Sequence, residues 1–309
     1  MEVRGSDKSF LCYATYNPTA YICGRAISFE PGDPMQQLRA MLERSIKLRK
    51  AFFENEDTNA YRLVNAEGDF IPGLIVDQYG EVVVLQSTTL GMDMLRDFIA
   101  DALMEIVQPK AIYEKSTGTS RKKEGLEDKE EWIRGDVKNV HPDGLTEDGK
   151  LIVKERGMSY VIELVGSQKT GLFLDQREMR SIVKQFAKDR TVLDCCSYVG
   201  GFAMNALAGG AKAADAVDYD KDAIAHASKN IEMNGIDLEY FGSYGEDVFV
   251  FLRRRPLPRS YDFIILDPPA FAKRSSDIEQ AKKAYTDMNR SAMMALPPGS
   301  LLLTCSCSY

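Results

Sequence analysis

The sequence has no apolar run long enough to cross a membrane and no apolar segment behind basic residues near its N-terminus. Its longest apolar runs, such as residues 261–266 and 301–303, fall far short of the roughly 20 residues that a membrane helix needs. A secretory signal is likewise not indicated. We therefore expect a cytoplasmic protein without a membrane partner.

The spacing of a metal site is also missing. Six cysteines in 309 residues are too few for a disulfide scaffold, and no two have the CxxC spacing of a zinc site. His141 and His226 have no partner at ligand spacing and are expected at the surface. We predict reduced thiols and no metal, with a disulfide or metal pair between Cys195 and Cys305 as the alternative. Small apolar core positions are expected for Cys12, Cys23, Cys195 and Cys196.

The sequence has no excess of positive charge, because 39 Lys and Arg residues are outnumbered by 46 Asp and Glu residues. The net charge of -7 argues against indiscriminate nucleic-acid binding, because contacts with phosphates need a dense positive field. Local basic clusters remain, and each one taken alone is expected to be a solvated surface. They lie at residues 47–50, 121–123, 253–255, 273–274 and 282–283.

The chain does contain enough apolar sequence for a buried core. Hydrophobic residues make up 44% of its 309 residues, a length that suits two domains. Short strands are expected in residues 1–30, with a turn at 16–18. A helix is then expected to begin at Asp33 and Pro34, which have the chemistry of a helix start.

The middle of the chain has the pattern of a second set of strands. Residues 61–87 predict an antiparallel meander, and a helix with apolar residues between 95 and 106 follows. Residues 116–150 are rich in charge and glycine and predict a loop, with a hairpin beginning after residue 149.

From residue 165 onward, strands and helices alternate. Nearly continuous apolar strands are separated by amphipathic helices, with an edge strand near 239–242 and a last strand in SLLLTCSC at 300–307. This alternation is typical of a parallel sheet with helices on both faces. The expected fold class is therefore α/β, with a doubly wound sheet.

The ends of these strands carry glycine and acidic residues. Asp194 closes the first strand, and Gly200 and Gly201 then let a ligand approach the backbone. Asp218 closes the second strand, where a carboxylate can accept from the hydroxyls of a ribose. These two features alone would also suit a dinucleotide.

Two further strand ends favour a different ligand. Asp247 follows the third strand and could accept from an adenine amino group, and DPPAF at 267–271 follows the fourth. A carboxylate, two prolines and an aromatic residue suit an enzyme that holds a planar base, rather than a dehydrogenase.

Four stretches together carry a family resemblance. They are GLFLDQR at 171–177, DCCSYVGGF at 194–202, DPPAF at 267–271 and TCSCS at 304–308. They resemble class I S-adenosylmethionine-dependent methyltransferases, and specifically the large-subunit ribosomal RNA cytosine-5 methyltransferase family. Cys195-Cys196 departs from the apolar and aromatic pair usual in that family.

The resemblance implies three segments. Residues 165–309 would be a Rossmann-like methyltransferase domain and residues 31–164 a small α+β domain. Residues 1–30 would be the tail of a β-rich PUA domain, most of which is missing, and the family's final strands after TCSCS would be missing too. The implied cofactor is S-adenosylmethionine and the implied partner is large-subunit ribosomal RNA, while a homodimer remains open.

The reaction of this family needs a thiol. A thiolate that adds at carbon 6 of cytosine makes carbon 5 a nucleophile for the methyl group. Asp267 is expected to hold the base edge near ring nitrogen 3. The nucleophile of related enzymes lies in a Thr-Cys-Ser stretch, which favours Cys305 over Cys307, although the sequence does not separate the two. The alternatives are methylation of another RNA atom, such as guanine nitrogen 7, or a non-catalytic RNA-binding remnant.

The resemblance also implies the other site residues. Asp218 would hold the ribose and Asp247 the adenine, whereas Asp175 and Arg177 either contact the cofactor's charged end or pack at a helix start. The expected cofactor-binding residues are Arg177, Asp194, Ser197, Tyr198, Gly200, Gly201, Phe202, Asp218, Asp247 and Asp267. The expected catalytic residues are Cys305, Asp267 and Cys307, and the expected substrate contacts are Pro268, Pro269 and Phe271.

Overall fold

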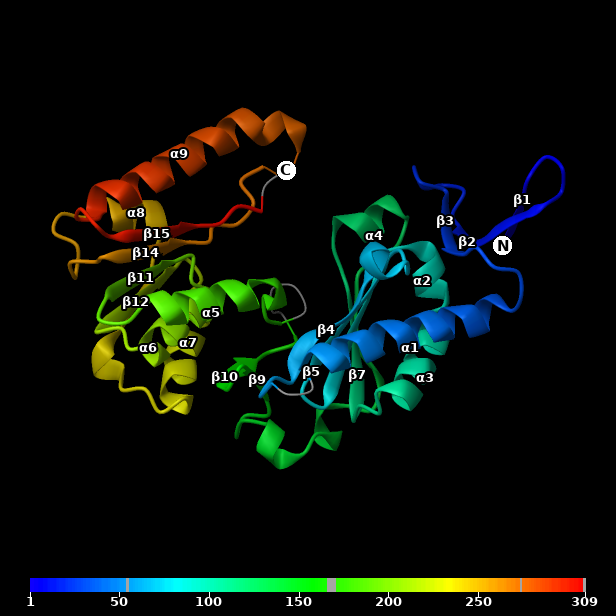
Figure 1. The fold of residues 1–309 in the computed structure, drawn as a ribbon, viewed down its shortest axis with the longest axis horizontal. Helices are drawn as coiled ribbons and strands as arrows, with labels where there is room; N and C mark the ends of the chain where they lie inside the picture. Colours follow the sequence, from blue (N-terminus) through cyan, green and yellow to red (C-terminus); the bar gives the residue numbers. More distant parts are fainter. Residues whose placement is uncertain (54–55, 166–170, 273, 308–309) are drawn as a thin grey trace. The chain divides into compact units, whose positions relative to one another are not determined.

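The chain forms two compact units, Met1–Leu174 and Asp175–Tyr309. Figure 1 shows the computed structural model, which describes every residue except 54–55, 166–170, 273 and 308–309. Each unit contains its own sheets and its own helices.

The first unit begins with a small antiparallel sheet. Its strands are β1 (Glu2–Arg4), β2 (Phe10–Tyr16) and β3 (Gly24–Ser28), in that order across the sheet. The predicted short strands are therefore confirmed, and β2 ends where the turn at residues 16–18 was expected.

Helix α1 (Pro34–Phe53) begins where its sequence predicts. The backbone N–H of Met35 donates to Oδ1 of Asp33 at 2.8 Å, which satisfies one of the free N–H groups at the helix start. Its apolar stripe packs into the core of the first unit through Leu38, Leu42 and Ile46.

A five-stranded sheet forms the centre of the first unit. Its order is β4 (Ala60–Asn65), β5 (Leu74–Tyr79), β6 (Val82–Ser87), β7 (Ala111–Ser116) and β8 (Lys129–Arg134). The pairs β4/β5 and β5/β6 are antiparallel, which confirms the predicted meander. The pair β6/β7 is parallel, and the chain between these strands forms α2 (Leu90–Met94) and α3 (Arg96–Ile106), the second predicted helix.

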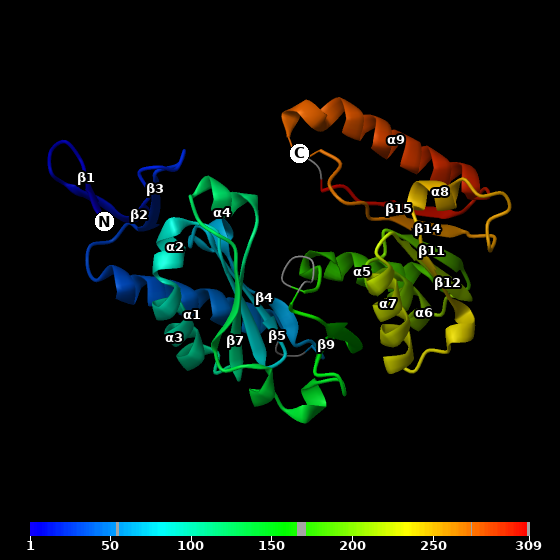
Figure 2. The same ribbon diagram turned by 180° about the vertical axis from the view of Figure 1, so that it is seen from behind.

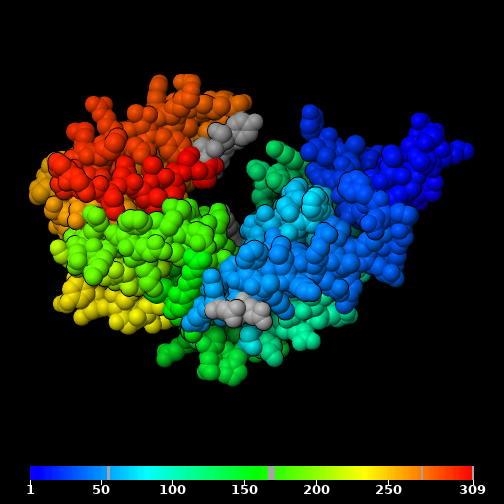
Figure 3. Space-filling model, in the orientation of Figure 1, coloured from blue at the N-terminus to red at the C-terminus, as the bar shows by residue number. Residues whose placement is uncertain are grey.

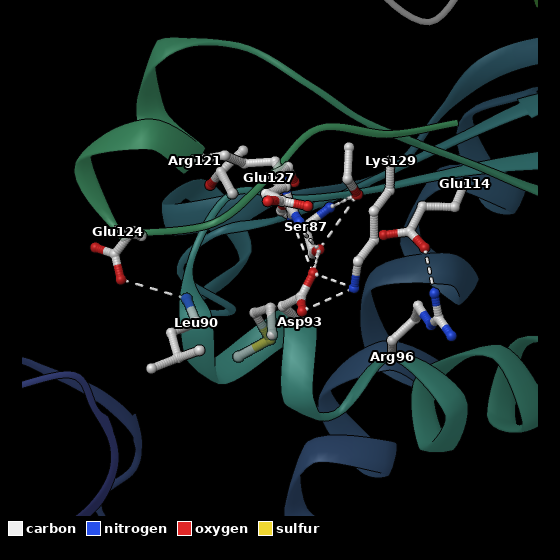
Figure 4. A network of polar contacts seen from close by, with 12 residues as sticks. Ser87, Leu90, Asp93, Arg96, Glu114, Arg121, Glu124, Glu127 and Lys129 are labelled. Atoms are coloured by element: carbon white, nitrogen blue, oxygen red, sulfur yellow. Dashed lines mark hydrogen bonds and ion pairs between the residues drawn. The ribbon is translucent and has the colours of Figure 1, made fainter. Parts of the chain in front are cut away.

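The loop predicted at residues 116–150 is wrong in part. It contains α4 (Thr119–Lys123) and strand β8, which pairs antiparallel with β7. Its charges are compatible with a strand because they are paired: Lys129 contacts Asp93, as Figure 4 shows. Arg121, expected in a solvated basic cluster, is fully buried. The predicted hairpin does follow, as β9 (Leu151–Glu155) and β10 (Met158–Ile162).

The second unit is a doubly wound sheet. Its five strands are all parallel and lie in the order β13-β12-β11-β14-β15. Figures 1 and 2 show α8 and α9 on one face of this sheet and α5, α6 and α7 on the other. The parallel sheet with helices on both faces is confirmed, and its strand order is Rossmann-like. The elements are α5 (Arg177–Phe186), β11 (Thr191–Cys195), α6 (Gly201–Ala208), β12 (Ala213–Asp218), α7 (Lys221–Met233), β13 (Phe241–Gly245), α8 (Val248–Leu252), β14 (Phe263–Leu266), α9 (Ile278–Ala295) and β15 (Leu301–Thr304).

Two strand limits differ from the sequence prediction. The edge strand β13 begins at Phe241 rather than near residue 239. Strand β15 ends at Thr304 and does not run through both cysteines. The N–H of Cys305 still donates to the carbonyl of Leu266 in β14 at 2.8 Å. The chain after β14 continues into Pro268 and Pro269, which have no N–H to donate to residues that follow β15. Pairing therefore stops at this level.

Short 3-10 turns complete the chain. They are η1 (Ala66–Asp69), η2 (Val137–Asn139), η3 (Pro142–Gly144), η4 (Leu174–Gln176), η5 (Leu238–Tyr240) and η6 (Ser275–Asp277). Of these, η4 leads directly into α5 and positions the first residues of the second unit.

Candidate active site at the carboxyl ends of the parallel strands

Three neighbouring strands of the second unit end at the same level. Leu266 of β14 pairs with Cys195 of β11 on one side and with Thr304 of β15 on the other. The next residue is therefore Cys196 after β11, Asp267 after β14 and Cys305 after β15. Because the helices that follow β11 and β14 lie on opposite faces, this is the switch point at which such sheets bind ligands.

The loop after β11 has an unusual backbone. Cys196, Tyr198 and Gly200 have φ angles of 60°, 50° and 74°, in the left-handed region that non-glycine residues rarely adopt. At Gly200 a Cβ atom would lie 2.7 Å from the Cβ of Ala227 in α7, so only glycine fits. Strain of this kind concentrates at ligand sites. Gly201 and Phe202 then begin α6. The N–H groups of its first turn have no partner within the helix and are directed back toward this loop.

Asp194 is fully buried at the end of β11. Its Oδ2 accepts from the N–H of Ala203 at 3.0 Å, while Oδ1 has no hydrogen-bond partner among the described residues. Burial raises the pKa of Asp194 to about 7, and the nearby carboxylates of Asp267 and Asp218 add to the rise. A buried carboxylate with a free oxygen fits a cationic group of a ligand.

Ser197 presents a second buried polar atom without a partner. Its Oγ makes no hydrogen bond among the described residues, although its N–H donates to the carbonyl of Val217 at 3.2 Å. An unsatisfied buried hydroxyl is costly, so a ligand contact would offset that cost.

Asp218 lies at the end of β12 and is half-buried. Its Oδ2 accepts from the N–H of Tyr198 at 2.8 Å and its Oδ1 accepts from the N–H of Asp220 at 2.9 Å. These bonds fix the orientation of the carboxylate, and each oxygen keeps a second lone pair for a hydroxyl group.

Asp247 is exposed and lies two residues after the end of β13. It is the N-cap of α8, where its Oδ1 accepts from the N–H of Val250 at 3.0 Å. Because capping uses one of its two oxygens, the other can accept from a ligand. The structure thus brings the four predicted acids to consecutive strand ends of one sheet.

Cys305 and Asp267 are neighbours across β14 and β15. The half-buried thiol of Cys305 is close enough to the side chains of Asp267 and Gln176 for both to shift its pKa. Burial raises the pKa of Cys305 to about 11, and the charge of Asp267 adds to the rise, whereas the amide of Gln176 opposes it. Cys307 is exposed, and its Sγ lies 3.8 Å from the carbonyl oxygen of Pro268. Part of the red segment that ends the described chain is visible on the face shown in Figure 3.

The residues after Asp267 divide into two groups. Pro268 is buried and Pro269 is exposed. Phe271 packs edge-on against Tyr285 of α9, with ring centroids 4.7 Å apart, so its ring contributes to the core. Phe271 therefore has a structural contact that the prediction of a substrate contact did not include.

Gln176 is the polar residue of this site that the sequence prediction missed. Its Nε2 lies 3.2 and 3.1 Å from the two oxygens of Asp267. Its neighbours Asp175 and Arg177 were considered instead; Arg177 is buried as the first residue of α5 and Asp175 is exposed. The motif GLFLDQR marked the segment but not the residue.

Several other predicted positions can be compared with the structure. All six cysteines are free, so Cys195 and Cys305 form no disulfide. Cys195 is buried as predicted, but Cys23 is exposed, because it lies in the turn before β3. His141 is exposed and His226 is half-buried. Within the described part of the chain, no cluster of side chains could hold a metal ion and no helix could span a membrane.

Comparisons with known proteins agree with this geometry. Residues 140–308 match a family described as S-adenosylmethionine-dependent methyltransferase. Ribosomal RNA large subunit methyltransferase I of Pseudoalteromonas translucida is 35% identical over 309 residues, which cover 99% of this chain and 76% of that protein.

Two solved structures extend the similarity to the fold. A candidate S-adenosylmethionine-dependent methyltransferase from Streptococcus mutans has a TM-score of 0.79 and 27% sequence identity. The alignment covers 98% of this chain and 76% of that one. SMU.776, a candidate methyltransferase complexed with SAH (S-adenosylhomocysteine), has the same TM-score, identity and coverage.

Proposed function

Because the chain belongs to the S-adenosylmethionine-dependent methyltransferase family and uses that cofactor, we propose that it methylates carbon 5 of a cytosine in large-subunit ribosomal RNA. The relatives that carry the name ribosomal RNA large subunit methyltransferase I support the choice of RNA. The single observation that supports the choice of carbon 5 is the thiol of Cys305 beside the carboxylate of Asp267. A ribosomal RNA substrate also agrees with the cytoplasmic location expected from the sequence.

The free polar atoms of the second unit suit the cofactor. We assign its ammonium group to Oδ1 of Asp194, its ribose hydroxyls to Asp218 and its adenine edge to Asp247. Ser197, Tyr198, Gly200, Gly201 and Phe202 form the surrounding backbone, and we retain Arg177 as a supporting residue. When bound, S-adenosylmethionine supplies an electrophilic methyl group.

Cys305 and Asp267 account for activation of the base. Carbon 5 of cytosine is a poor nucleophile, so a thiolate must first add at carbon 6. In our proposal, Cys305 is that nucleophile, and Asp267 in its protonated form donates to ring nitrogen 3, where the negative charge of the adduct accumulates. Pro268 and Pro269 stiffen the backbone that carries Asp267. A base then takes the carbon 5 proton, the electrons of that C–H bond form the carbon 5–carbon 6 double bond, and the Cys305 thiolate leaves carbon 6, which restores the aromatic ring.

Cys305 is favoured over Cys307 by its surroundings. Its thiol contacts the catalytic carboxylate, whereas the Sγ of Cys307 points to a backbone carbonyl at 3.8 Å. Its raised pKa means that substrate or cofactor must promote formation of the thiolate, since few molecules carry it near neutral pH.

We also propose how the chain divides into domains. The separate sheet β1-β2-β3 would correspond to the tail of an RNA-binding PUA domain at residues 1–30. Residues 31–164 would be the small α+β domain, and residues 165–309 the methyltransferase domain. A homodimer stays an open alternative for the assembly.

The test of the reaction is a covalent trap. RNA that carries 5-fluorocytosine at the target position can be methylated but has no carbon 5 proton to lose, so the protein should remain attached through Cys305. The adduct should disappear in Cys305→Ala and persist in Cys307→Ala. Methylation of ordinary RNA by Cys305→Ala should fall by several orders of magnitude, because the covalent route is lost.

Other outcomes would identify the alternatives. Full methylation by Cys305→Ala would indicate an atom that needs no thiol, such as guanine nitrogen 7. An adduct lost only in Cys307→Ala would exchange the two cysteines. Cofactor binding without methylation of any large-subunit RNA would favour a non-catalytic RNA-binding protein.

A further inference from the structure

Gln176 lies at the start of α5, where a side chain can cap the helix, but its side chain donates to Asp267 at the end of β14 instead. It is the N-cap residue of α5, but no hydrogen bond connects its side chain with the start of that helix. Glutamine is not among the residues preferred at this position. Its Nε2 instead lies 3.2 Å from Oδ1 and 3.1 Å from Oδ2 of Asp267, 91 residues along the chain.

The same amide also acts on the neighbouring thiol. Cys305 is held beside Asp267, because its N–H donates to the carbonyl of Leu266, and the side chains of Gln176 and Asp267 both shift the pKa of its thiol. The two side chains have opposite effects, since the carboxylate of Asp267 raises the pKa of Cys305 and Gln176 lowers it. Gln176 is thus an uncharged donor placed between two groups that repel each other when both are ionised.

We propose that Gln176 is a positioning residue of the methyl-transfer site, which fixes the Asp267 carboxylate and stabilises the Cys305 thiolate through its amide hydrogens. An amide nitrogen has two hydrogens and no charge, so it can serve a carboxylate and a thiolate together. The inference rests on the proposed function in one respect, because it takes Cys305 as the nucleophile.

The simpler interpretation is that Gln176 only ties the start of α5 to the end of β14. Such a tie would affect the free energy of unfolding. It would not change the chemistry of one thiol in the folded protein. The reactivity of Cys305 in the folded, substrate-free protein therefore separates a positioning role from a purely structural one.

The experiment compares Gln176→Met and Gln176→Glu with the unchanged protein. Both replacements are close to glutamine in size, but methionine removes the donor and glutamate replaces it with a second carboxylate. The full chain is treated with iodoacetamide at about pH 9, and alkylation of Cys305 is followed by mass spectrometry. Gln185→Met is the matched control, because Gln185 lies exposed on the same helix. The exposed Cys307 is the reference thiol within each molecule.

We expect alkylation of Cys305 to slow about tenfold in Gln176→Met, as for the loss of a hydrogen bond to a charged group. It should slow further in Gln176→Glu. The rate at Cys307 and the rate in Gln185→Met should not change. Equal rates at Cys305 in all four proteins would overturn the proposal, even if stability fell. This measurement uses neither RNA nor cofactor, so it gives its answer whether or not the fluorocytosine adduct forms.

A kinetic readout adds a second arm. In Gln176→Met, kcat for RNA methylation should fall at least tenfold, while the Kd for S-adenosylhomocysteine stays the same. An unchanged kcat with slowed alkylation would contradict the proposed role in methyl transfer. A fall in cofactor affinity equal to the fall in kcat would mean that Gln176 acts on the cofactor, and would also contradict it.

Discussion

Asp194 is the residue at which stability and ligand binding oppose each other. Burial raises its pKa from 3.8 to about 7, so folding favours the protonated carboxyl group. Its contribution to stability is therefore complete below about pH 4 and is lost as the pH rises through about 7. Near neutral pH the site contains a costly buried carboxylate, which a cationic ligand group can compensate.

Replacement of Asp194 by asparagine should separate these two properties. The amide cannot ionise but can still accept from the N–H of Ala203. We expect the free energy of unfolding to increase by roughly 2–4 kcal/mol at about pH 8, and by less at about pH 5. Affinity for S-adenosylmethionine should fall by about 2 kcal/mol. Urea unfolding and calorimetric titration measure the two effects.

Two results would contradict this account of Asp194. A destabilised variant at about pH 8 would mean that the buried carboxylate is well solvated or paired. An unchanged affinity would place the ammonium group of the cofactor elsewhere. Asp194→Ala is a less suitable variant because it also removes the acceptor for the N–H of Ala203.

At the scale of single residues, the sequence predicts the acids of the candidate site but not its glutamine. Asp194 and Asp218 lie among the last residues of apolar strands and Asp267 directly follows one, so the end of a recognisable element marks each of them. Gln176 has no such mark, because its partners become neighbours only when the start of α5 lies beside the ends of β14 and β15. A long polar side chain at a helix start has many conformations available, and tertiary contacts select one.

At the scale of elements, residues 116–150 contain a helix and a strand where composition predicts a loop, because their charged side chains are paired. Figure 4 shows Arg121 of α4 and Lys129 of β8 converging on Asp93 of α2. The Nη1 of Arg121 also donates to the carbonyl of Ser87 at 2.8 Å, and its Nε donates to the carbonyl of Glu127 at 2.8 Å. Composition alone predicts a solvated loop here, because it does not reveal that an acid on α2 pairs with the charges and that Ser87 of β6 accepts from Arg121.

This network predicts a large cost for the loss of Arg121. Its side chain is fully buried, so Arg121→Met leaves the carboxylate of Asp93 and the carbonyl of Ser87 short of a donor. We expect the free energy of unfolding of the first unit to fall by about 3 kcal/mol, as for other broken buried ion pairs. Lys122→Met, on the exposed side of the same helix, should be nearly neutral. Urea denaturation of the variants provides the comparison.

A second substitution tests whether the lost pairing is the cause. Lys129 still pairs with Asp93 in Arg121→Met, so Asp93→Leu is made alone and together with Arg121→Met, and the double variant should lose less stability than the sum of the two single losses. Equal stability of Arg121→Met and Lys122→Met would mean that the buried ion pair contributes little to the first unit.

At the scale of the whole molecule, the sequence specified the sheet but not where one unit ends. The strand-helix alternation predicted the parallel sheet, whereas the domain limit at residue 165 was a prediction from the resemblance. The compact units meet at Leu174 and Asp175. Leu172 explains part of this difference, because its N–H donates to the hydroxyl of Tyr79 at 3.2 Å and anchors the motif's first residues in the first unit. The motif GLFLDQR therefore spans the limit between the units.

The division into two units predicts how the molecule unfolds. Units with separate cores need not unfold together, and a ligand that binds one of them stabilises only that one. We expect two calorimetric transitions, of which only one moves upward with S-adenosylhomocysteine. At 100 times Kd, the ligand should add about 2.7 kcal/mol to the stability of the second unit. Arg121→Met should lower the midpoint temperature only of the transition that does not respond to the ligand, which is that of the first unit. Asp194→Asn should raise the midpoint temperature only of the second unit's transition, at about pH 8. A single transition that moves with the ligand and with both variants would show that the two units unfold as one.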